Sequence, residues 1–222
     1  MESVSNSKTI TIRNEKWLLL SEKAVFWKSK EMLILCDLHL GKSGHFRKSG
    51  IPAPGRINSK NLERLSYLID QFVPKNVLIL GDLFHSSANR EWFEFEEWLQ
   101  KNSDTEFTLV TGNHDILHNT FYKAANFELH SELKIGPFLF VHDNGKATEL
   151  PAGTTVVGGH IHPAVTLKGK GRQSLRFPAF IISDQRILLP AFGEFTGLHA
   201  IALNETDKAY ALVEEHIISI NS

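Results

Sequence analysis

Short runs of apolar residues, separated by polar turns, dominate the first half of the chain. Runs of this length are typical of β-strands, and a run without polar positions is typical of a strand buried on both faces. We expect strands at Thr9–Ile12, Trp17–Leu20, Ala24–Trp27, Met32–Leu35, Val77–Leu80 and Phe107–Val110.

Two longer segments repeat apolar residues at helical spacing. The first follows Pro54 and stops at Pro74, because proline cannot continue a helix. Its apolar positions are Ile57, Leu65, Leu68, Ile69 and Phe72. The second spans Arg90–Lys101 and repeats the helical period through Trp92, Phe95 and Leu99. Both segments are expected to be α-helices.

The second half is mostly strand-like, with Gly, Pro and polar turns between the apolar runs. The expected strands are Phe138–Val141, Thr155–Val157, Ala164–Leu167, Leu175–Phe177, Arg186–Leu189, His199–Ala202, Ala209–Val213 and Ile217–Ile220. Alternating strands and helices followed by a β-rich half predict two stacked sheets with helices outside. No repeat or composition break divides the chain, so we expect one domain over residues 1–222.

The composition is that of an ordinary soluble protein, with 42% hydrophobic and 22% charged residues. A formal net charge of −1 carries no global signal for nucleic acid or membrane, so any basic surface must be local. The single cysteine, Cys36, cannot form an intramolecular disulfide. With no signal peptide and no run of ~18 apolar residues, we expect a cytoplasmic protein without membrane contact.

Five short segments place metal-binding side chains directly after an apolar run or in a tight turn. They are Asp37-Leu38-His39, Gly81-Asp82, Gly112-Asn113-His114-Asp115, Val141-His142 and Gly159-His160-Ile161-His162. A lone Asp-x-His carries almost no information, and any single histidine is more often a satisfied surface or core residue. The five segments together, in this order, predict a metal site.

Each segment suits metal binding for a separate reason. Residues two apart in an extended chain point the same way, so Asp37 and His39 can converge on one ion. The same holds for His160 and His162, unless a turn directs them to different ions. The two carboxylate oxygens of Asp82 can bridge two cations, and Asn113 adds a neutral oxygen ligand.

In this order the segments resemble the calcineurin-like metallophosphoesterase superfamily, whose blocks run Asp-x-His, Gly-Asp, Gly-Asn-His-Asp/Glu, His and Gly-His-x-His. The resemblance spans residues 37–162 and implies an α/β fold, a four-layer α/β/β/α sandwich of two mixed sheets flanked by helices. Two metal ions would lie at the carboxyl edge of the strands. It assigns Asp37, His39, Asp82 and His162 to the first ion and Asp82, Asn113, His142 and His160 to the second.

The same resemblance makes His114 the catalytic residue that faces the substrate. A hydroxide shared by two ions would attack phosphorus, and His114 would neutralise charge or protonate the leaving oxygen. Many members carry an aspartate that orients this histidine, three residues after the Gly-Asp aspartate. Here that position is His85. His85 either contacts the substrate or is a satisfied loop histidine, and this leaves the proton-donor role of His114 open.

A narrower resemblance lies in Asp37–Pro54 and Gly81–Ser86. These stretches are similar to the DNA ligase-associated metallophosphoesterases, a bacterial group tied to DNA repair that hydrolyses phosphodiesters and can nick DNA. The resemblance implies DNA as the substrate and ligase-associated repair proteins as partners. The mixed Asp, His and Asn ligands favour Mn²⁺, while Fe and Zn stay possible.

Cations near the motifs could contact flanking phosphates. Lys42, Arg47 and Lys48 follow the first ligand pair, and we expect them to bind substrate together with His85. A second cluster follows His162 and consists of Lys168, Lys170, Arg172 and Arg176. Solvated surface charge is the alternative for both clusters.

Two other functions stay open from the sequence. A nucleotide-sugar lipid pyrophosphatase of the same superfamily also has Asp-x-His-Leu, although no long amphipathic insertion for acyl chains is present. A non-catalytic scaffold with this fold normally lacks the catalytic histidine, whereas His114 is present. The late strands and the aromatic helix are also a candidate surface for a homo-oligomer.

Overall fold

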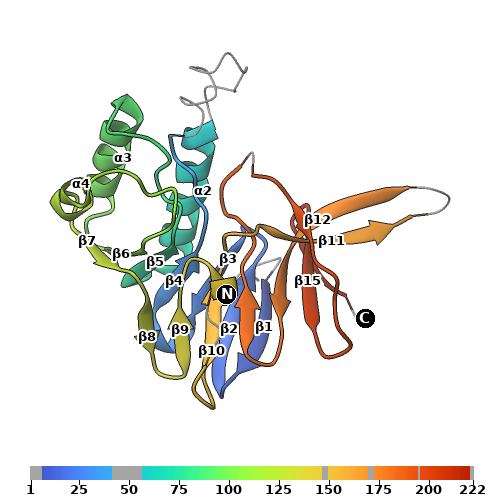
Figure 1. Cartoon of the computed structure of the whole chain (residues 1–222). Helices are drawn as coiled ribbons and strands as arrows, with labels where there is room; N and C mark the ends of the chain where they lie inside the picture. Colours follow the sequence, from blue (N-terminus) through green and yellow to red (C-terminus); the bar gives the residue numbers. More distant parts are fainter. Residues whose placement is uncertain (1–6, 42–56, 147–149, 170–172, 195, 221–222) are drawn as a thin grey trace.

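The computed structural model describes residues 7–41, 57–146, 150–169, 173–194 and 196–220. Two β-sheets pack against each other, and the α-helices cover the outer face of the first sheet (Figure 1). No helix within the described ranges has both the length and the hydrophobicity to cross a membrane.

The first sheet has seven strands in chain order. They are β1 (Ser7–Ile12), β2 (Glu15–Leu20), β3 (Ala24–Trp27), β4 (Met32–Leu35), β5 (Asn76–Leu80), β6 (Glu106–Val110) and β7 (Phe127–His130). The first four strands pair antiparallel, whereas β4 to β7 pair parallel. A short 3-10 helix, η1 (Lys28–Lys30), lies between β3 and β4.

Parallel strands need crossover connections, and helices supply them here. They are α2 (Ile57–Phe72), α3 (Arg90–Lys101) and α4 (Asn119–Ala124). Leu65 and Leu68 of α2 and Trp92 of α3 belong to the same buried cluster as Leu33 and Val77 of the sheet. The two helices expected from apolar spacing are therefore confirmed, with their apolar faces on the first sheet.

The second sheet is mixed, with nine strands. They are β8 (Leu133–Ile135), β9 (Phe138–Phe140), β10 (Thr155–Gly158), β11 (Pro163–Lys168), β12 (Ser174–Ile182), β13 (Arg186–Leu188), β14 (His199–Ala200), β15 (Lys208–Val213) and β16 (His216–Ile220). Seven of them follow the order β14-β11-β12-β13-β10-β9-β8, and β15 and β16 extend from β12. A 3-10 helix, η2 (Asn144–Lys146), follows β9.

Strand β12 is longer than expected because it changes partners along its length. Up to Pro178 it pairs with β11, and from Ala179 onward it pairs with β15 and then also with β13. Proline cannot donate a ladder hydrogen bond, so it is tolerated where pairing changes. The expected end at Phe177 was wrong for this reason.

The two-sheet α/β architecture is confirmed, but its outer layers differ from each other. The outer face of the second sheet carries a small cluster that includes Val165, Ala179 and Ala211. Ile201 and Leu203, from the non-helical stretch after β14, pack on this cluster. Within the described part of the chain, all three α-helices lie in the crossovers of the first sheet.

Three short elements between residues 119 and 135 were not expected from the sequence. Helix α4 has six residues and β8 has three, which is too short for a periodic apolar pattern. Strand β7 lies at the edge of the first sheet and carries Glu128 and His130. Edge strands need less apolar sequence than central ones because one side faces solvent.

Aromatic side chains fill the space between the sheets. Trp17 and Trp27 from the first sheet meet Phe138 from the second, with ring centroids 4.6 and 5.2 Å from that of Phe138. All three side chains are buried. Offset and edge-on aromatic contacts of this kind add to the stabilisation from burial alone.

We expect Phe138→Ala to lower the free energy of unfolding by about 3–5 kcal/mol, because it leaves a cavity between the sheets. Urea denaturation followed by circular dichroism measures this change. Phe93→Ala is the control, since Phe93 on α3 is 54% exposed, and we expect a change within about 0.5 kcal/mol. Similar losses in the two variants would contradict the inter-sheet core.

Candidate metal centre

The carboxyl ends of five strands meet at one edge of the two sheets. Strands β4, β5 and β6 end there in the first sheet, and β9 and β10 in the second. The backbone N–H of His160 donates to Oδ2 of Asp37 at 2.9 Å, so the two sheets are joined at this edge. All five motif segments therefore lie together, as the sequence predicts.

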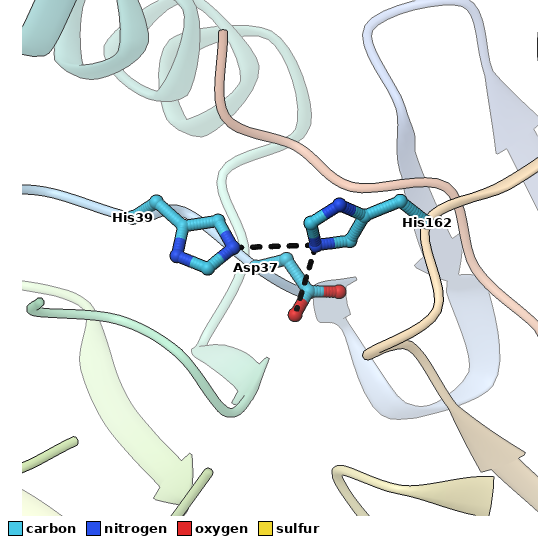
Figure 2. A group of neighbouring side chains, drawn as sticks. All are labelled: Asp37, His39 and His162. Carbon is cyan, nitrogen blue, oxygen red and sulfur yellow. Dashed lines mark hydrogen bonds and ion pairs between the residues drawn. The ribbon is translucent and has the colours of Figure 1, made fainter. Parts of the chain in front are cut away.

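Asp37, His39 and His162 form one group of converging side chains (Figure 2). The Nε2 atoms of His39 and His162 are 3.2 Å apart. Nε2 of His162 lies 3.7 Å from Oδ1 of Asp37. Asp37 and His39 are buried, whereas His162 is half-buried.

Asp82, His142 and His160 form a second group. Nε2 of His142 lies 2.9 Å from Nδ1 of His160 and 3.4 Å from Oδ1 of Asp82. The amide oxygen of Asn113 is 3.0 Å from the same nitrogen. His142 donates its Nδ1–H to the carbonyl oxygen of Leu80 at 3.0 Å, which leaves a lone pair on Nε2 for the group.

Asp82 lies between the two groups. One carboxylate oxygen, Oδ2, is 3.9 Å from Nε2 of His39, and the other, Oδ1, is 3.4 Å from Nε2 of His142. The side chain is 2% exposed. A single carboxylate thus faces both groups, which is the arrangement that a bridging ligand requires.

The donor atoms of both groups fit divalent cations. Within each group the ligand atoms lie within 4.8 Å of one another. Imidazole nitrogen, carboxylate oxygen and amide oxygen together suit first-row metals such as Mn, Fe and Zn. Oδ1 of the fully buried Asp37 accepts no hydrogen bond from any described residue. A cation between these acceptors would remove their mutual repulsion and satisfy that oxygen.

Asp37 is charged despite its burial. Burial raises the pKa of Asp37, but His162, Cys36 and His142 together hold it below the usual value of an aspartate. Cys36 behaves in the opposite way, because burial raises the pKa of its thiol well above the usual value. Its Sγ contacts the carbonyl oxygen of Pro190 at 3.4 Å. A buried thiol with a raised pKa is a structural group and a poor nucleophile.

The convergence of the ligands does not come from an extended chain. Five of the candidate ligands have left-handed backbone angles: Asp37 (φ 53°), His39 (φ 50°), Asp82 (φ 51°), His160 (φ 69°) and His162 (φ 51°). The extended geometry expected for Asp37 and His39 was therefore wrong. Turns also place His160 and His162 in different groups, the alternative left open by the sequence. Left-handed angles at residues other than glycine cost about 1–3 kcal/mol each, so the surroundings must hold them.

Residues 36–40, here called the Asp37 loop, donate backbone hydrogen bonds to the loop that follows β5. The N–H of Asp37 donates to Gly81 O at 3.1 Å, that of His39 to Asp82 O at 2.8 Å, and that of Leu40 to Leu83 O at 2.9 Å. The two loops thus form a short parallel ladder beyond the ends of β4 and β5.

The carbonyl groups of the Asp37 loop accept hydrogen bonds from two other parts of the chain. Phe192 N–H donates to Cys36 O at 2.8 Å and Gly193 N–H to Asp37 O at 3.0 Å. The buried amide of Asn61, on α2, donates to Leu38 O at 3.2 Å. A Cβ at Gly193 would lie 2.5 Å from Leu38 O, so only glycine allows this approach. The roles of Asn61 and Gly193 were not predicted from the sequence.

Asp115 ties the loops of Asp82 and Asn113 together. Its carboxylate accepts hydrogen bonds from the backbone N–H groups of Leu83 at 2.8 Å, Phe84 at 3.1 Å and Gly112 at 2.8 Å. Burial raises the pKa of Asp115 to about 6, although these hydrogen bonds oppose the shift. The last residue of the Gly-Asn-His-Asp motif is therefore a structural anchor.

His114 and His85 lie beside the two groups without belonging to either. Their ring centroids are 4.0 Å apart, and that of His114 is 6.2 Å from that of His39. The backbone N–H of His114 donates to Oδ1 of Asp82 at 3.0 Å. Both rings are half-buried, so they border the centre and face its open side. The other expected substrate residues, Lys42, Arg47 and Lys48, lie outside the described residues.

Residues 32–193 match the family model of calcineurin-like phosphoesterases. This range is most of the chain and contains every candidate ligand. The chain therefore belongs to the calcineurin-like phosphoesterase family. Members of this family use divalent metal ions, which agrees with the two groups of ligand atoms.

A solved structure has a similar fold. The nuclease MPE of Pseudomonas putida is similar, with a TM-score of 0.81 and 28% identity, over 96% of this chain and 100% of that chain. The phosphoesterase Yfce of E. coli has a TM-score of 0.46 and 16% identity, over 85% and 97% of the two chains. No curated protein matches the sequence.

We expect Asn61→Leu to weaken Mn²⁺ binding by about 10–100-fold, the usual effect of removing a group that orients metal ligands. The reason is that Leu38 O loses its donor, so the flanking Asp37 and His39 are less well fixed. Calorimetric titration of metal-free protein with Mn²⁺ measures the affinity.

Asn76→Leu is the matched control for Asn61→Leu. Asn76 is the first residue of β5, at the end of the strand away from the metal centre, where its amide donates to Thr108 Oγ1 at 2.9 Å. Both variants should lose stability, by about 1 kcal/mol for each lost hydrogen bond. Only Asn61→Leu should lose metal affinity. Equal affinities in the two variants would contradict the role of Asn61 in orienting the ligands.

Proposed function

We propose that this protein is a dinuclear metal-dependent phosphodiesterase that cleaves DNA. The position of Asp82 between two groups of ligand atoms carries the dinuclear part of the proposal. Membership in the calcineurin-like phosphoesterase family supports the reaction, and similarity to a nuclease supports the nucleic-acid substrate. We further propose Mn²⁺ as the metal and a role in DNA repair beside a DNA ligase.

In this proposal the ligands divide as the two groups suggest. Asp37, His39 and His162 would hold one ion, and His142, His160 and Asn113 would hold the other, with Asp82 available to both. When bound, such a metal pair polarises the phosphate and lowers the pKa of a coordinated water towards about 7. The left-handed loops and the buried hydrogen bonds keep the ligands in place before the substrate arrives.

His114 and His85 act on the substrate side of the centre. Their adjacent rings can donate N–H groups to the phosphate oxygens that do not bind a metal, which stabilises the extra charge of the transition state. We propose that His114 also donates the proton to the leaving oxygen. The hydrogen bond from the backbone N–H of His114 to Asp82 places His114 next to the shared ligand, which supports this assignment.

Asp82→Ala should abolish metal-dependent hydrolysis of both single-stranded DNA and bis-p-nitrophenyl phosphate, because both groups lose their shared ligand. Turnover of Mn²⁺-loaded protein measures the loss. Asp184→Ala is the control, since Asp184 is an exposed residue in the turn between β12 and β13. Unchanged turnover in Asp82→Ala would refute the shared ligand. Preference of the wild type for a monoester or a nucleotide-sugar lipid would refute the substrate class.

His114→Ala should lower kcat on DNA by about 10²–10⁴-fold, the usual contribution of a general acid. The loss on bis-p-nitrophenyl phosphate should be much smaller, because p-nitrophenolate leaves without a proton. Steady-state kcat on the two substrates gives the ratio. Equal losses on both would mean that His114 acts through charge or positioning and not as a proton donor.

A further inference from the structure

The β11–β12 hairpin is a two-stranded arm that begins next to the metal centre. β11 starts at Pro163, directly after the candidate ligand His162. Figure 1 shows the hairpin projecting away from both sheets. β11 pairs with β14 only at Pro163 and Ala164, and β12 meets β13 and β15 only from Ala179 onward. The outer part of the hairpin therefore has no further strand partner within the described residues.

The strand register gives the arm one polar and one apolar face. Thr166 pairs with Arg176, and Lys168 pairs with Ser174, so these four side chains share a face. The opposite face carries Val165, Leu167, Leu175 and Phe177. Its inner part packs into the cluster on the outer face of the second sheet, which anchors the arm. All four residues of the polar face are exposed.

The charge of the arm is unlike that of the whole chain. Residues 163–178 contain four Lys and Arg residues and no Asp or Glu, whereas the chain has a formal net charge of −1. Lys168 and Arg176 form no ion pair or hydrogen bond with any described residue. By contrast, the exposed Arg90 is paired with Glu94 at 2.8 Å. The polar face thus presents cations that no carboxylate of the described segments neutralises.

The cations lie too far from the metal centre to touch the phosphate being cleaved. A strand rises about 3.3 Å per residue, so Arg176, opposite Thr166, lies roughly 13 Å along the arm from His162, and Lys168 roughly 20 Å. Neighbouring phosphates of one DNA strand are about 3.4 Å apart along the duplex axis. Cations at these distances would meet phosphates several nucleotides away.

We propose that this arm is a nucleic-acid-binding element, in which Arg176 and Lys168 contact backbone phosphates outside the cleavage site. The inference rests on the proposed phosphodiesterase function and adds a binding surface to it. Contacts to backbone phosphates carry no sequence information, so Arg176 and Lys168 supply affinity without sequence preference, and this affinity falls as salt screens and replaces the contacts.

The test uses the full-length, Mn²⁺-loaded protein with Lys168→Ala and Arg176→Ala combined. The KM for a single-stranded 20-mer should rise, and the slope of log KM against log salt should fall by about 0.7 for each lost phosphate contact. kcat on the 20-mer should stay unchanged. Hydrolysis of bis-p-nitrophenyl phosphate and of a dinucleotide should also stay unchanged, because neither substrate reaches the arm.

Lys101→Ala combined with Lys123→Ala is the charge-matched control. These exposed lysines end α3 and α4, so the control removes two positive charges far from the arm. A salt slope that is equal in the arm variant and the control overturns the inference but leaves the proposed function standing. Loss of bis-p-nitrophenyl phosphate hydrolysis in the arm variant also overturns it, since the substitutions would then act on the metal centre.

Failure of the proposed function has a different signature. Wild-type protein that hydrolyses bis-p-nitrophenyl phosphate but neither binds nor cleaves the 20-mer would overturn the nucleic-acid substrate, and the arm inference with it. An arm variant that keeps its DNA affinity but loses binding to an acidic protein would assign the arm to a protein partner, against the proposal.

Discussion

The structure depends on keeping acceptor atoms close together in a buried pocket. Two carboxylates and several imidazole nitrogens converge within a few ångströms, and Asp37 and Asp82 are almost completely buried. Acceptors in such a place repel one another and lose their water. Contacts of the surrounding backbone must therefore keep these acceptor atoms together until a bound cation offsets their repulsion. Most of the unusual local features of the fold serve this purpose.

The surrounding backbone meets that demand in two ways. Left-handed residues turn the ligands inward at the strand ends, and hydrogen bonds to both the amide and carbonyl sides of the Asp37 loop fix them. Glycines allow the loops to approach closely. A Cβ at Gly159 would lie 2.4 Å from Oδ2 of Asp37, and one at Gly112 would lie 2.4 Å from Oδ1 of Asp82. The centre is a property of packed loops, since no single strand supplies its geometry.

The sequence predicts the parts of this arrangement that depend on residue type and order. Apolar runs identify the central strands and two helices, and the five motifs identify which side chains meet. The sequence cannot reveal Asn61, because a buried amide on α2 acts through a contact with Leu38 that exists only in the folded chain. The extended backbone predicted for Asp37 and His39 was wrong, because extended and left-handed residues can both bring alternate side chains together. Short edge elements such as β7 are set by the neighbouring strand more than by their own residues.

Reactivity and substrate choice depend on different parts of the structure. The two buried ligand groups lie on either side of Asp82, and nothing in them distinguishes one phosphoester from another. Selectivity must therefore come from residues that the fold leaves exposed around the open edge. On the His162 side that surface is a cationic arm, whereas on the His142 side a groove of about 410 Å³ is bordered by Glu132 and Asp143. In the proposed function this contrast in charge would direct a polyanionic substrate along the arm, because carboxylates beside the groove repel phosphate.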